Sequence, residues 1–172
     1  MKIKTLLLSL LAFVVLTFSS CDKEDYTDLY TGYYDVKVTQ NLKVIAPIYG
    51  EIPLQEENIY GTAQIVKDEN EGDSNVKILM SLKEGGLYYL DAYCDQTCMR
   101  IENKSVNTTH IISPYNNVRF NYTLNGANVY PQDLTWTSNV SGTCTTNAWE
   151  TSQKIYNVSG TLKFTYTKKE NN

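Results

Sequence analysis

The sequence contains a single histidine, His110, and this scarcity limits the chemistry that the chain can perform. Nucleophilic catalysis needs a general base, and His110 is the one conventional candidate. The chain also has no Gly-x-Ser-x-Gly elbow and no glycine-rich phosphate loop. Glu56 and Glu57 are adjacent, so on a strand they would point to opposite faces and could not act as a carboxylate pair. We therefore expect a protein that is not an enzyme and needs no cofactor.

Positive charge is also scarce, because 15 lysines and arginines stand against 19 aspartates and glutamates and give a net charge of −4. Nucleic-acid binding depends on basic side chains that neutralise phosphates, so we expect no nucleic-acid partner. The long apolar run at 6–18 is well short of the roughly 20 residues that a transmembrane helix needs. No Gly/Ser/Pro-rich linker and no convincing repeat divides the chain, so we expect one domain.

The residues that are abundant favour β-strands, since the chain has 14 tyrosines and many threonines, valines and isoleucines. Apolar and polar residues alternate with a period of two at 34–39, 59–65, 76–82, 118–125, 134–140 and 158–167. Further strands are expected at 87–93, 99–102 and 106–112, and a short helical turn at 147–153. Alternation with one polar face indicates antiparallel strands that pack on one side only.

The beginning of the chain resembles the export signal of a bacterial lipoprotein. Two lysines precede the apolar run, and Ser19 and Ser20 directly precede Cys21. A small pair before a cysteine resembles the lipobox, in which the signal is cut before the cysteine and that cysteine carries the lipid. The charged run at 22–25 is similar to the acidic tether of surface-exported lipoproteins of Bacteroidota. The alternative is an ordinary secretory signal with an incidental cysteine.

This resemblance implies a signal peptide at 1–20 and a lipidated cysteine with a flexible tether at 21–28. A folded domain is then expected at 29–168 and a tail at 169–172. Cys21 would attach the protein to a membrane through acyl chains such as palmitate, which anchor firmly when several act together. We therefore expect the protein in the cell envelope, anchored to the outer membrane, with exposure on the cell surface left open.

The first expected strand opens with Tyr30-Thr31-Gly32-Tyr33-Tyr34. This segment resembles the Gly-x-aromatic start of lipocalin-like and calycin-like domains. The resemblance implies an all-β fold, a single antiparallel barrel of about eight strands. Glycines inside strands, such as Gly61 and Gly160, fit the bends that a barrel needs. An immunoglobulin-like β-sandwich is the alternative, although the chain has no Cys–Trp–Cys pattern of suitable spacing.

The lipocalin-like resemblance also implies a function, which is to hold a small apolar ligand inside the barrel. The inward residues expected to line the cavity are Tyr34, Val36, Phe120, Tyr122, Trp136 and Phe164. The alternative is a surface interaction module without an internal ligand, which binds a glycan or an envelope protein partner through edge strands and exposed tyrosines. The candidates for such tyrosines are Tyr33, Tyr60, Tyr88, Tyr115, Tyr130 and Tyr156.

Three further cysteines follow Cys21, at Cys94, Cys98 and Cys144. Cys94 and Cys98 flank an expected hairpin tip, where a disulfide could form in an oxidising compartment. A bond from Cys144 to either of them would close a longer loop and stabilise more, and the sequence does not choose between these pairings. These cysteines and His110 could also form a zinc site, but their spacing matches no zinc motif, so we expect no metal.

Overall fold

The computed structural model describes residues 25–54, 57–72, 74–83, 86–112, 115–146 and 154–170, without the side chains of 57, 108–112, 115–118 and 146. The predictions for the signal peptide, for lipidation of Cys21 and for a helical turn at 147–153 lie outside these residues, as does the side chain of His110. In the part of the chain that is described, no helix is long and apolar enough to cross a membrane.

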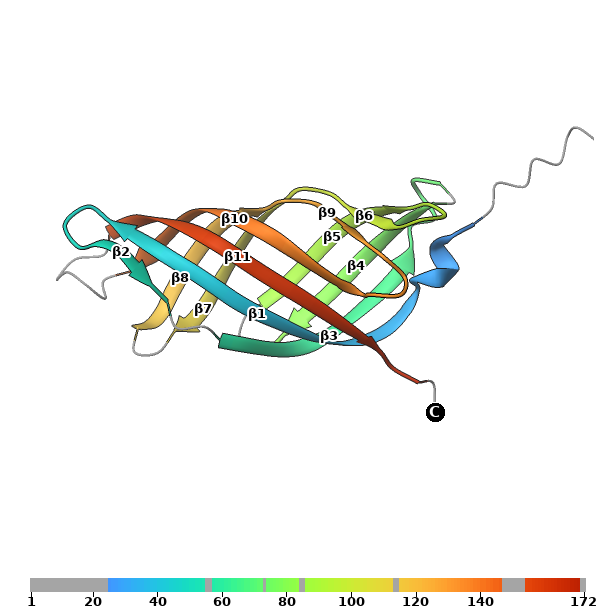
Figure 1. Cartoon of the computed structure of the whole chain (residues 1–172), viewed down its shortest axis with the longest axis horizontal. Helices are drawn as coiled ribbons and strands as arrows, with labels where there is room; N and C mark the ends of the chain where they lie inside the picture. The colour runs from blue at the N-terminus through green and yellow to red at the C-terminus, as the bar shows by residue number, and fades with distance from the viewer. Residues whose placement is uncertain are drawn as a thin grey trace, which may run out of the picture.

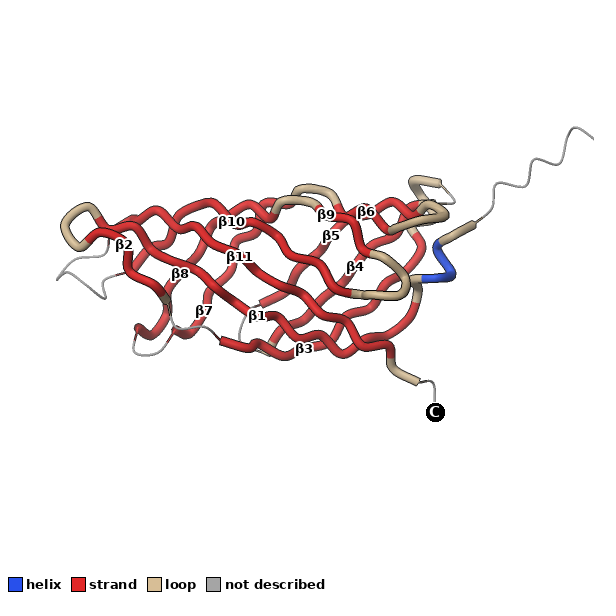
Figure 2. The backbone as a smooth tube through the Cα atoms, in the orientation of Figure 1, coloured by secondary structure: helices blue, strands red, loops and turns tan. Residues whose placement is uncertain are grey.

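The described chain is almost entirely β-structure, preceded by a short 3-10 helix, η1 (Thr27–Leu29) (Figure 2). The strands are β1 (Gly32–Ala46), β2 (Gly50–Pro53), β3 (Glu57–Lys67), β4 (Asn75–Leu82), β5 (Gly86–Cys94), β6 (Met99–Ile101), β7 (Lys104–Ile112), β8 (Tyr115–Leu124), β9 (Ala127–Val129), β10 (Thr135–Thr146) and β11 (Lys154–Lys168). This confirms the all-β class. The sequence does not predict β2 and β9, because three or four residues are too few for a clear alternation.

The alternation of apolar and polar residues produces one buried face. In β1 every second side chain from Tyr34 to Ala46 is buried, and β4 follows the same period. The buried side chains join into a single hydrophobic core. In Figure 1 this core lies between a near wall that contains β1, β10 and β11 and a far wall that contains β4, β5, β7 and β8. The polar face of each strand therefore forms the outer surface of the molecule.

The strands belong to one antiparallel sheet in the order β7-β8-β10-β11-β1-β3-β4-β5-β6-β9, with β2 paired to β1. The sheet curls strongly on itself into a half-barrel (Figure 1). The expectation of a curled antiparallel sheet is confirmed, but the closed barrel of about eight strands is wrong. The sheet instead has eleven strands, ten of them on one hydrogen-bonded path with two ends, β7 and β9, and β2 off this path. Since the described strands form a single sheet, they do not form the alternative two-sheet sandwich either.

Two short interruptions separate β6 from β7 and β8 from β9. β6 leads into β7 across 102–103, and β8 leads into β9 across 125–126, so the two interruptions face each other. The backbone N–H of Gly126 donates to Asn103 Oδ1 at 2.6 Å in place of a ladder bond. A Cβ on Gly126 would lie 2.2 Å from the carbonyl oxygen of Ile101, so only glycine fits this approach. The side-chain bond and the tight approach divide each long strand into two shorter ones.

The segment before β1 is attached to the sheet, although residues 25–28 fall in the expected flexible tether. Thr27 is fully buried, and Lys67 Nζ of β3 lies 2.5 Å from Asp25 Oδ2. Asp25 Oδ1 accepts a hydrogen bond from the backbone N–H of Thr27 at 2.9 Å. Tyr30 is also fully buried, and its hydroxyl donates to the carbonyl oxygen of Val129 at 3.3 Å. These contacts hold the segment against β3 and β9.

The attachment of this segment is expected to depend on pH through Asp25. The hydrogen bond from Lys67, with those from Thr27, lowers the pKa of Asp25 from 3.8 to about 2. Because the pKa is lower in the folded state, the stabilisation is complete above pH 3.8 and is lost as the pH falls towards 2. In urea unfolding, Asp25→Asn should be less stable than the wild type at neutral pH and equal to it near pH 2. An equal difference at both pH values would contradict this assignment.

Candidate functional site

A row of four side chains crosses the outer face of four neighbouring strands. Tyr33 of β1 pairs in register with Gln64 of β3, Gln64 pairs with Leu79 of β4, and Leu79 pairs with Tyr89 of β5. Directly opposed residues on one face lie about 5 Å apart, so the four side chains form a continuous line. Their chain neighbours, such as Tyr34 and Tyr88, point into the core. Because the alternate residues of these strands are buried, the side chains of the row point outward.

This row forms part of an open groove of about 260 Å³. The outward residues that line it are Tyr33, Thr62, Gln64, Leu79, Ser81, Leu87, Tyr89 and Lys169. Tyr33 and Tyr89 are 56% and 58% exposed, which is high for aromatic side chains. Leu87 is 60% exposed. The groove thus combines accessible aromatic and apolar surface with hydroxyl, amide and ammonium groups.

Hydrogen bonds hold the Tyr33 end of the groove. Gln64 Nε2 donates to the Tyr33 hydroxyl at 3.1 Å, and the backbone N–H of Lys169 donates to the carbonyl oxygen of Tyr33 at 2.9 Å. Lys169 Nζ lies 2.9 Å from Asp35 Oδ1, so the chain segment after β11 is fixed beside β1. The Tyr33 side chain is therefore held at its hydroxyl and its backbone, while more than half of its surface stays accessible. A fixed aromatic ring loses little conformational entropy when a ligand stacks on it.

A second groove of about 350 Å³ continues from the first. Both grooves are lined by Thr62 and Ser81, and the second extends to Asp35, Tyr60 and Lys83. Asp35 is the one carboxylate among the described residues that line the two grooves, and it is ion-paired with Lys169. General acid–base hydrolysis would need a second carboxyl group nearby. The arrangement is suited to binding by stacking and hydrogen bonding.

The six residues that the sequence predicts to line a ligand cavity lie in the core. Trp136 stacks on Phe164 with ring centroids 4.1 Å apart. The Tyr122 hydroxyl lies 2.8 Å from the Tyr88 hydroxyl, and the Tyr34 hydroxyl donates to the carbonyl oxygen of Tyr30 at 2.5 Å. The full set, Tyr34, Val36, Phe120, Tyr122, Trp136 and Phe164, is almost completely buried. These side chains pack against other side chains, as they do in a filled interior. That they line a ligand cavity stays a prediction.

One buried side chain in the core is not satisfied. Gln40 of β1 is fully buried, and among the described residues neither its Nε2 nor its Oε1 has a hydrogen-bond partner. Such a group costs roughly 1–3 kcal/mol, because its desolvation is not compensated. The other buried polar side chain on a nearby inward face, Ser138, has partners, since its hydroxyl lies 3.0 Å from the carbonyl oxygen of Asn125. A polar group of a ligand bound in the interior would therefore find a hydrogen-bond partner in Gln40.

Replacing Gln40 gives a test of this unsatisfied amide. Gln40→Met keeps the shape of the side chain and removes both polar groups, so it should raise the free energy of unfolding by about 1–3 kcal/mol. Ser138→Ala is the control, because it removes a bonded hydroxyl and should lower stability by about 1 kcal/mol. Urea unfolding of both variants measures the difference. A loss of stability in Gln40→Met would show that the amide has a partner in solution.

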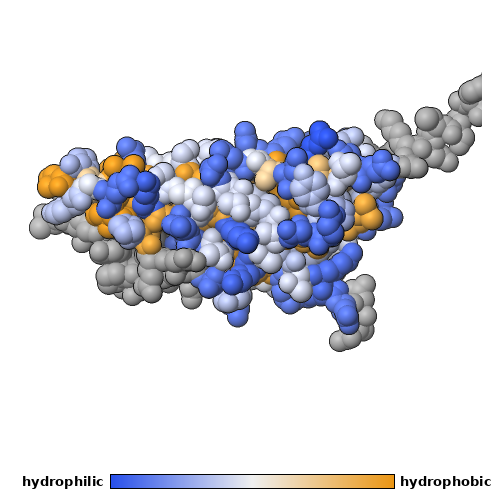
Figure 3. Space-filling model, in the orientation of Figure 1, coloured by the Kyte–Doolittle hydropathy of each residue, from blue (hydrophilic) through white to orange (hydrophobic). Residues whose placement is uncertain are grey.

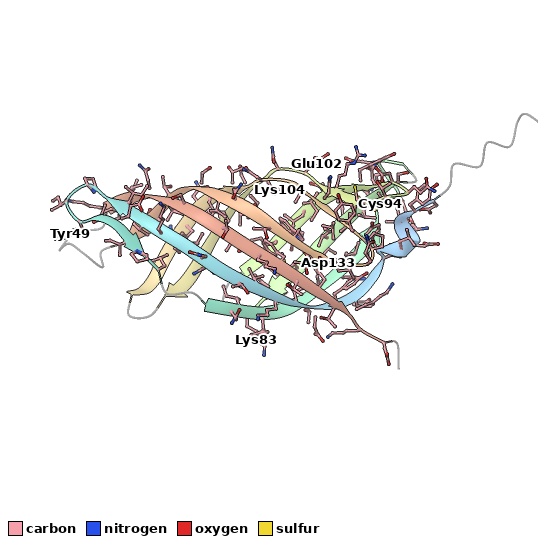
Figure 4. All side chains as sticks on the ribbon, viewed as in Figure 1. Tyr49, Lys83, Cys94, Glu102, Lys104 and Asp133 are labelled. Atoms are coloured by element: carbon pink, nitrogen blue, oxygen red, sulfur yellow. The ribbon has the colours of Figure 1, made fainter. Side chains whose placement is uncertain are left out.

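The three cysteines of the folded part are free and buried. The predicted hairpin tip is present, because the backbone N–H of Asp95 donates to the carbonyl oxygen of Cys98 at 3.0 Å. Cys94 and Asp133 lie at the same end of the molecule (Figure 4). Cys144 lies about 30 Å further along β10 from its start at Thr135. The structure therefore brings Cys94 and Cys98 close together and separates Cys144 from both, and a Cys94–Cys98 disulfide stays a prediction.

The cysteine thiols are protected in this fold. Burial raises the pKa of Cys94 to about 12 and the pKa of Cys144 to about 11. The reactive form of cysteine is the thiolate, which is scarce at such pKa values. Within the described residues, no cluster of three or more histidine, cysteine, aspartate or glutamate side chains is placed to hold a metal ion.

The structure shows which of the tyrosines predicted to make surface contacts are exposed. Tyr33, Tyr60 and Tyr130 are exposed, as predicted, whereas Tyr88 and Tyr156 are buried. The side chain of Tyr115 lies outside the described part. The sequence interpretation missed three exposed tyrosines, which are Tyr49, Tyr89 and Tyr93. Tyr89 is the one of these that lines the groove.

A second group of exposed apolar residues lies at the turn between β1 and β2 and at the start of β11. It consists of Ile48, Tyr49 and Ile155, and Figure 4 shows Tyr49 at the end of the molecule opposite to Cys94. Apolar surface is also visible around this end in Figure 3, while much of the remaining visible surface is hydrophilic. None of the three residues lines the grooves on β1, β3 and β4. Tyr49 is therefore a suitable control for the groove tyrosines.

Comparison with protein families and with curated proteins identifies no relative from which a function could be assigned. No protein-family model matches the sequence, and no curated protein has significant similarity to it.

Proposed function

We propose that this chain is a non-catalytic binding protein of the cell envelope that binds a glycan on the outer face of β1, β3, β4 and β5. A lipid on Cys21 would hold it at the outer membrane. The observation that supports this proposal is the row of Tyr33, Gln64, Leu79 and Tyr89 in an open groove. Sugar rings present an apolar face and a rim of hydroxyl groups. Exposed tyrosines offer stacking surface for the face, and amide and hydroxyl groups offer partners for the rim.

A glycan fits this groove better than an envelope protein would. Protein interfaces bury roughly 800 Å² on each partner and have an apolar centre. In the groove, Gln64 lies between Tyr33 and Leu79 in the row, and the hydroxyl groups of Thr62 and Ser81 line the groove beside it. Such a mixture within a narrow groove suits a small, hydroxyl-rich ligand.

Screening the purified protein against a panel of immobilised saccharides tests the proposal. We expect at least one saccharide class to bind, with an affinity in the micromolar to millimolar range that calorimetry can measure. Binding should occur without any change to the saccharide, which chromatography of the recovered ligand shows. Absence of binding to every saccharide, or cleavage of the ligand, would contradict the proposal.

A second candidate is the internal ligand that the lipocalin-like resemblance implies. The observation that favours it is the unsatisfied amide of Gln40 in the core. A small, largely apolar molecule with one polar group would satisfy this amide while its apolar part contacts the core. Native mass spectrometry of the purified protein tests this candidate. A co-purified mass that is lost on denaturation would support it, and a clean mass of the protein alone would contradict it.

A further inference from the structure

We propose that the saccharide bound in this groove is acidic, and that Lys83 and Lys37 bind its carboxylate. This inference rests on the proposed function, because it names the class of glycan for the same site. It starts from the second groove, where Tyr60 and Lys83 form one end. Figure 4 shows Lys83 beside β3, directed away from the sheet.

The register places both lysines next to Tyr60. Lys37 of β1 pairs with Tyr60 of β3, and the backbone N–H of Lys83 donates to the carbonyl oxygen of Tyr60 at 2.9 Å. Adjacent strands lie about 4.8 Å apart, so the two lysines begin about 10 Å from each other on either side of the tyrosine. Lysine side chains are long and flexible, so both ammonium groups can reach one anion above the Tyr60 ring.

These two lysines differ from most of the other lysines that the structure describes. Lys37 and Lys83 have no ion-pair partner within the described ranges, although both are exposed. Acidic partners are present for Lys43, Lys67, Lys77, Lys104 and Lys169. The chain as a whole carries a net charge of −4, so two unpaired cations beside a groove are a local reversal of its charge. A negatively charged ligand complements that reversal.

The one acid in the groove does not oppose this assignment. Asp35 lines the second groove, but Lys169 Nζ lies 2.9 Å from its Oδ1 and neutralises much of its charge. The charged groups that line the two grooves are Lys83 and the Asp35–Lys169 pair, and Lys37 stands beside them, next to Tyr60 on β1. Their sum is positive.

The spacing of the groove also sets the length of the ligand. Tyr33 and Lys37 are four residues apart on β1, which corresponds to roughly 13 Å along the strand. A short oligosaccharide can span this distance, with one ring against the Tyr33–Tyr89 row and an acidic ring at Tyr60. Hydroxyl groups of Thr62 and Ser81 lie between these two positions.

The test compares two matched probes, digalacturonic acid and the neutral galactobiose of the same linkage, by calorimetry on the purified protein. We expect the acidic disaccharide to bind at least tenfold more tightly, and this preference to decrease as salt is added, because exposed charges are screened. Lys83→Met and Lys37→Met should each reduce the affinity for digalacturonic acid severalfold and reduce the affinity for galactobiose by less. Lys43→Met, which changes an ion-paired lysine about 20 Å further along β1 and outside both grooves, is the control and should keep the preference.

The outcomes separate this inference from the proposed function. Equal binding of the two probes, with both lost in Tyr89→Ala, would overturn the acidic ligand and keep the glycan site. An acidic preference that survives in Lys83→Met and Lys37→Met would also overturn the inference. If neither probe binds and the saccharide panel is also negative, both proposals fail.

Discussion

Replacing Tyr33 and Tyr89 together by alanine is expected to lower the affinity for the bound saccharide about a hundredfold. Each ring supplies stacking surface at one end of the row, and loss of a well-placed aromatic contact commonly costs about 1.4 kcal/mol or more, which is a factor of ten. The single variants should each lose about tenfold. Calorimetry with the saccharide selected from the panel measures all three changes.

The controls separate loss of the site from loss of the fold. Tyr49 and Tyr130 are also exposed, but neither lines the grooves, so Tyr49→Ala and Tyr130→Ala should bind with unchanged affinity. All the variants should unfold at nearly the same urea concentration as the wild type, because solvated side chains contribute little to stability. Wild-type affinity in the Tyr33/Tyr89 double variant would show that the saccharide does not bind in this groove.

The second large effect is expected from Gly160→Ala in β11. Gly160 has a φ of +147°, a conformation that is rare for residues with a side chain. A Cβ at this position would lie 2.2 Å from the carbonyl oxygen of Asn41 in β1. The backbone of β1 is part of one of the two longest pairings in the sheet and cannot move away locally. We expect a loss of about 3 kcal/mol or more in the free energy of unfolding.

Gly50→Ala is the matched control for this substitution. Gly50 also has a positive φ, +72°, but no atom lies within 4 Å of a Cβ built there. It should therefore lose only about 1 kcal/mol, which is the cost of the backbone conformation alone. Urea unfolding of the two variants compares them directly. Similar losses in both would show that close approach of β11 to β1 is not what requires glycine at 160.

The alternation of side chains was enough to predict the strands but not their arrangement. Val76, Ile78 and Met80 are buried as their period indicates, because the period of a strand depends only on local geometry. The short strand β9 after Gly126 could not be predicted, because it forms by pairing with β6, which is distant in the sequence. The nine expected strands are present, while β2 and β9 were missed.

Prediction of the candidate site from the sequence was limited in the same way, at Tyr88 and Tyr89. Both are tyrosines in one strand, so one of them faces the core, and composition alone does not identify which. Leu90 and Ala92 share the face of Tyr88 and are buried with it, which leaves Tyr89 outside. The phase of Leu90 and Ala92 therefore identifies Tyr89 as the outward tyrosine. The row that Tyr89 forms with Tyr33 depends on the register of four strands, which long-range pairing determines.

The most direct test of the outer-face site is an NMR titration of the protein with the selected saccharide. The side-chain amide of Gln64, in the row, and the side-chain amide of Gln40, in the core, give separate signals, as does the indole of Trp136. The account predicts that the signals of Gln64, Leu79 and Tyr89 shift on binding while those of Gln40 and Trp136 stay in place. Shifts confined to Gln40 and Trp136 would contradict it and place the ligand inside the curled sheet.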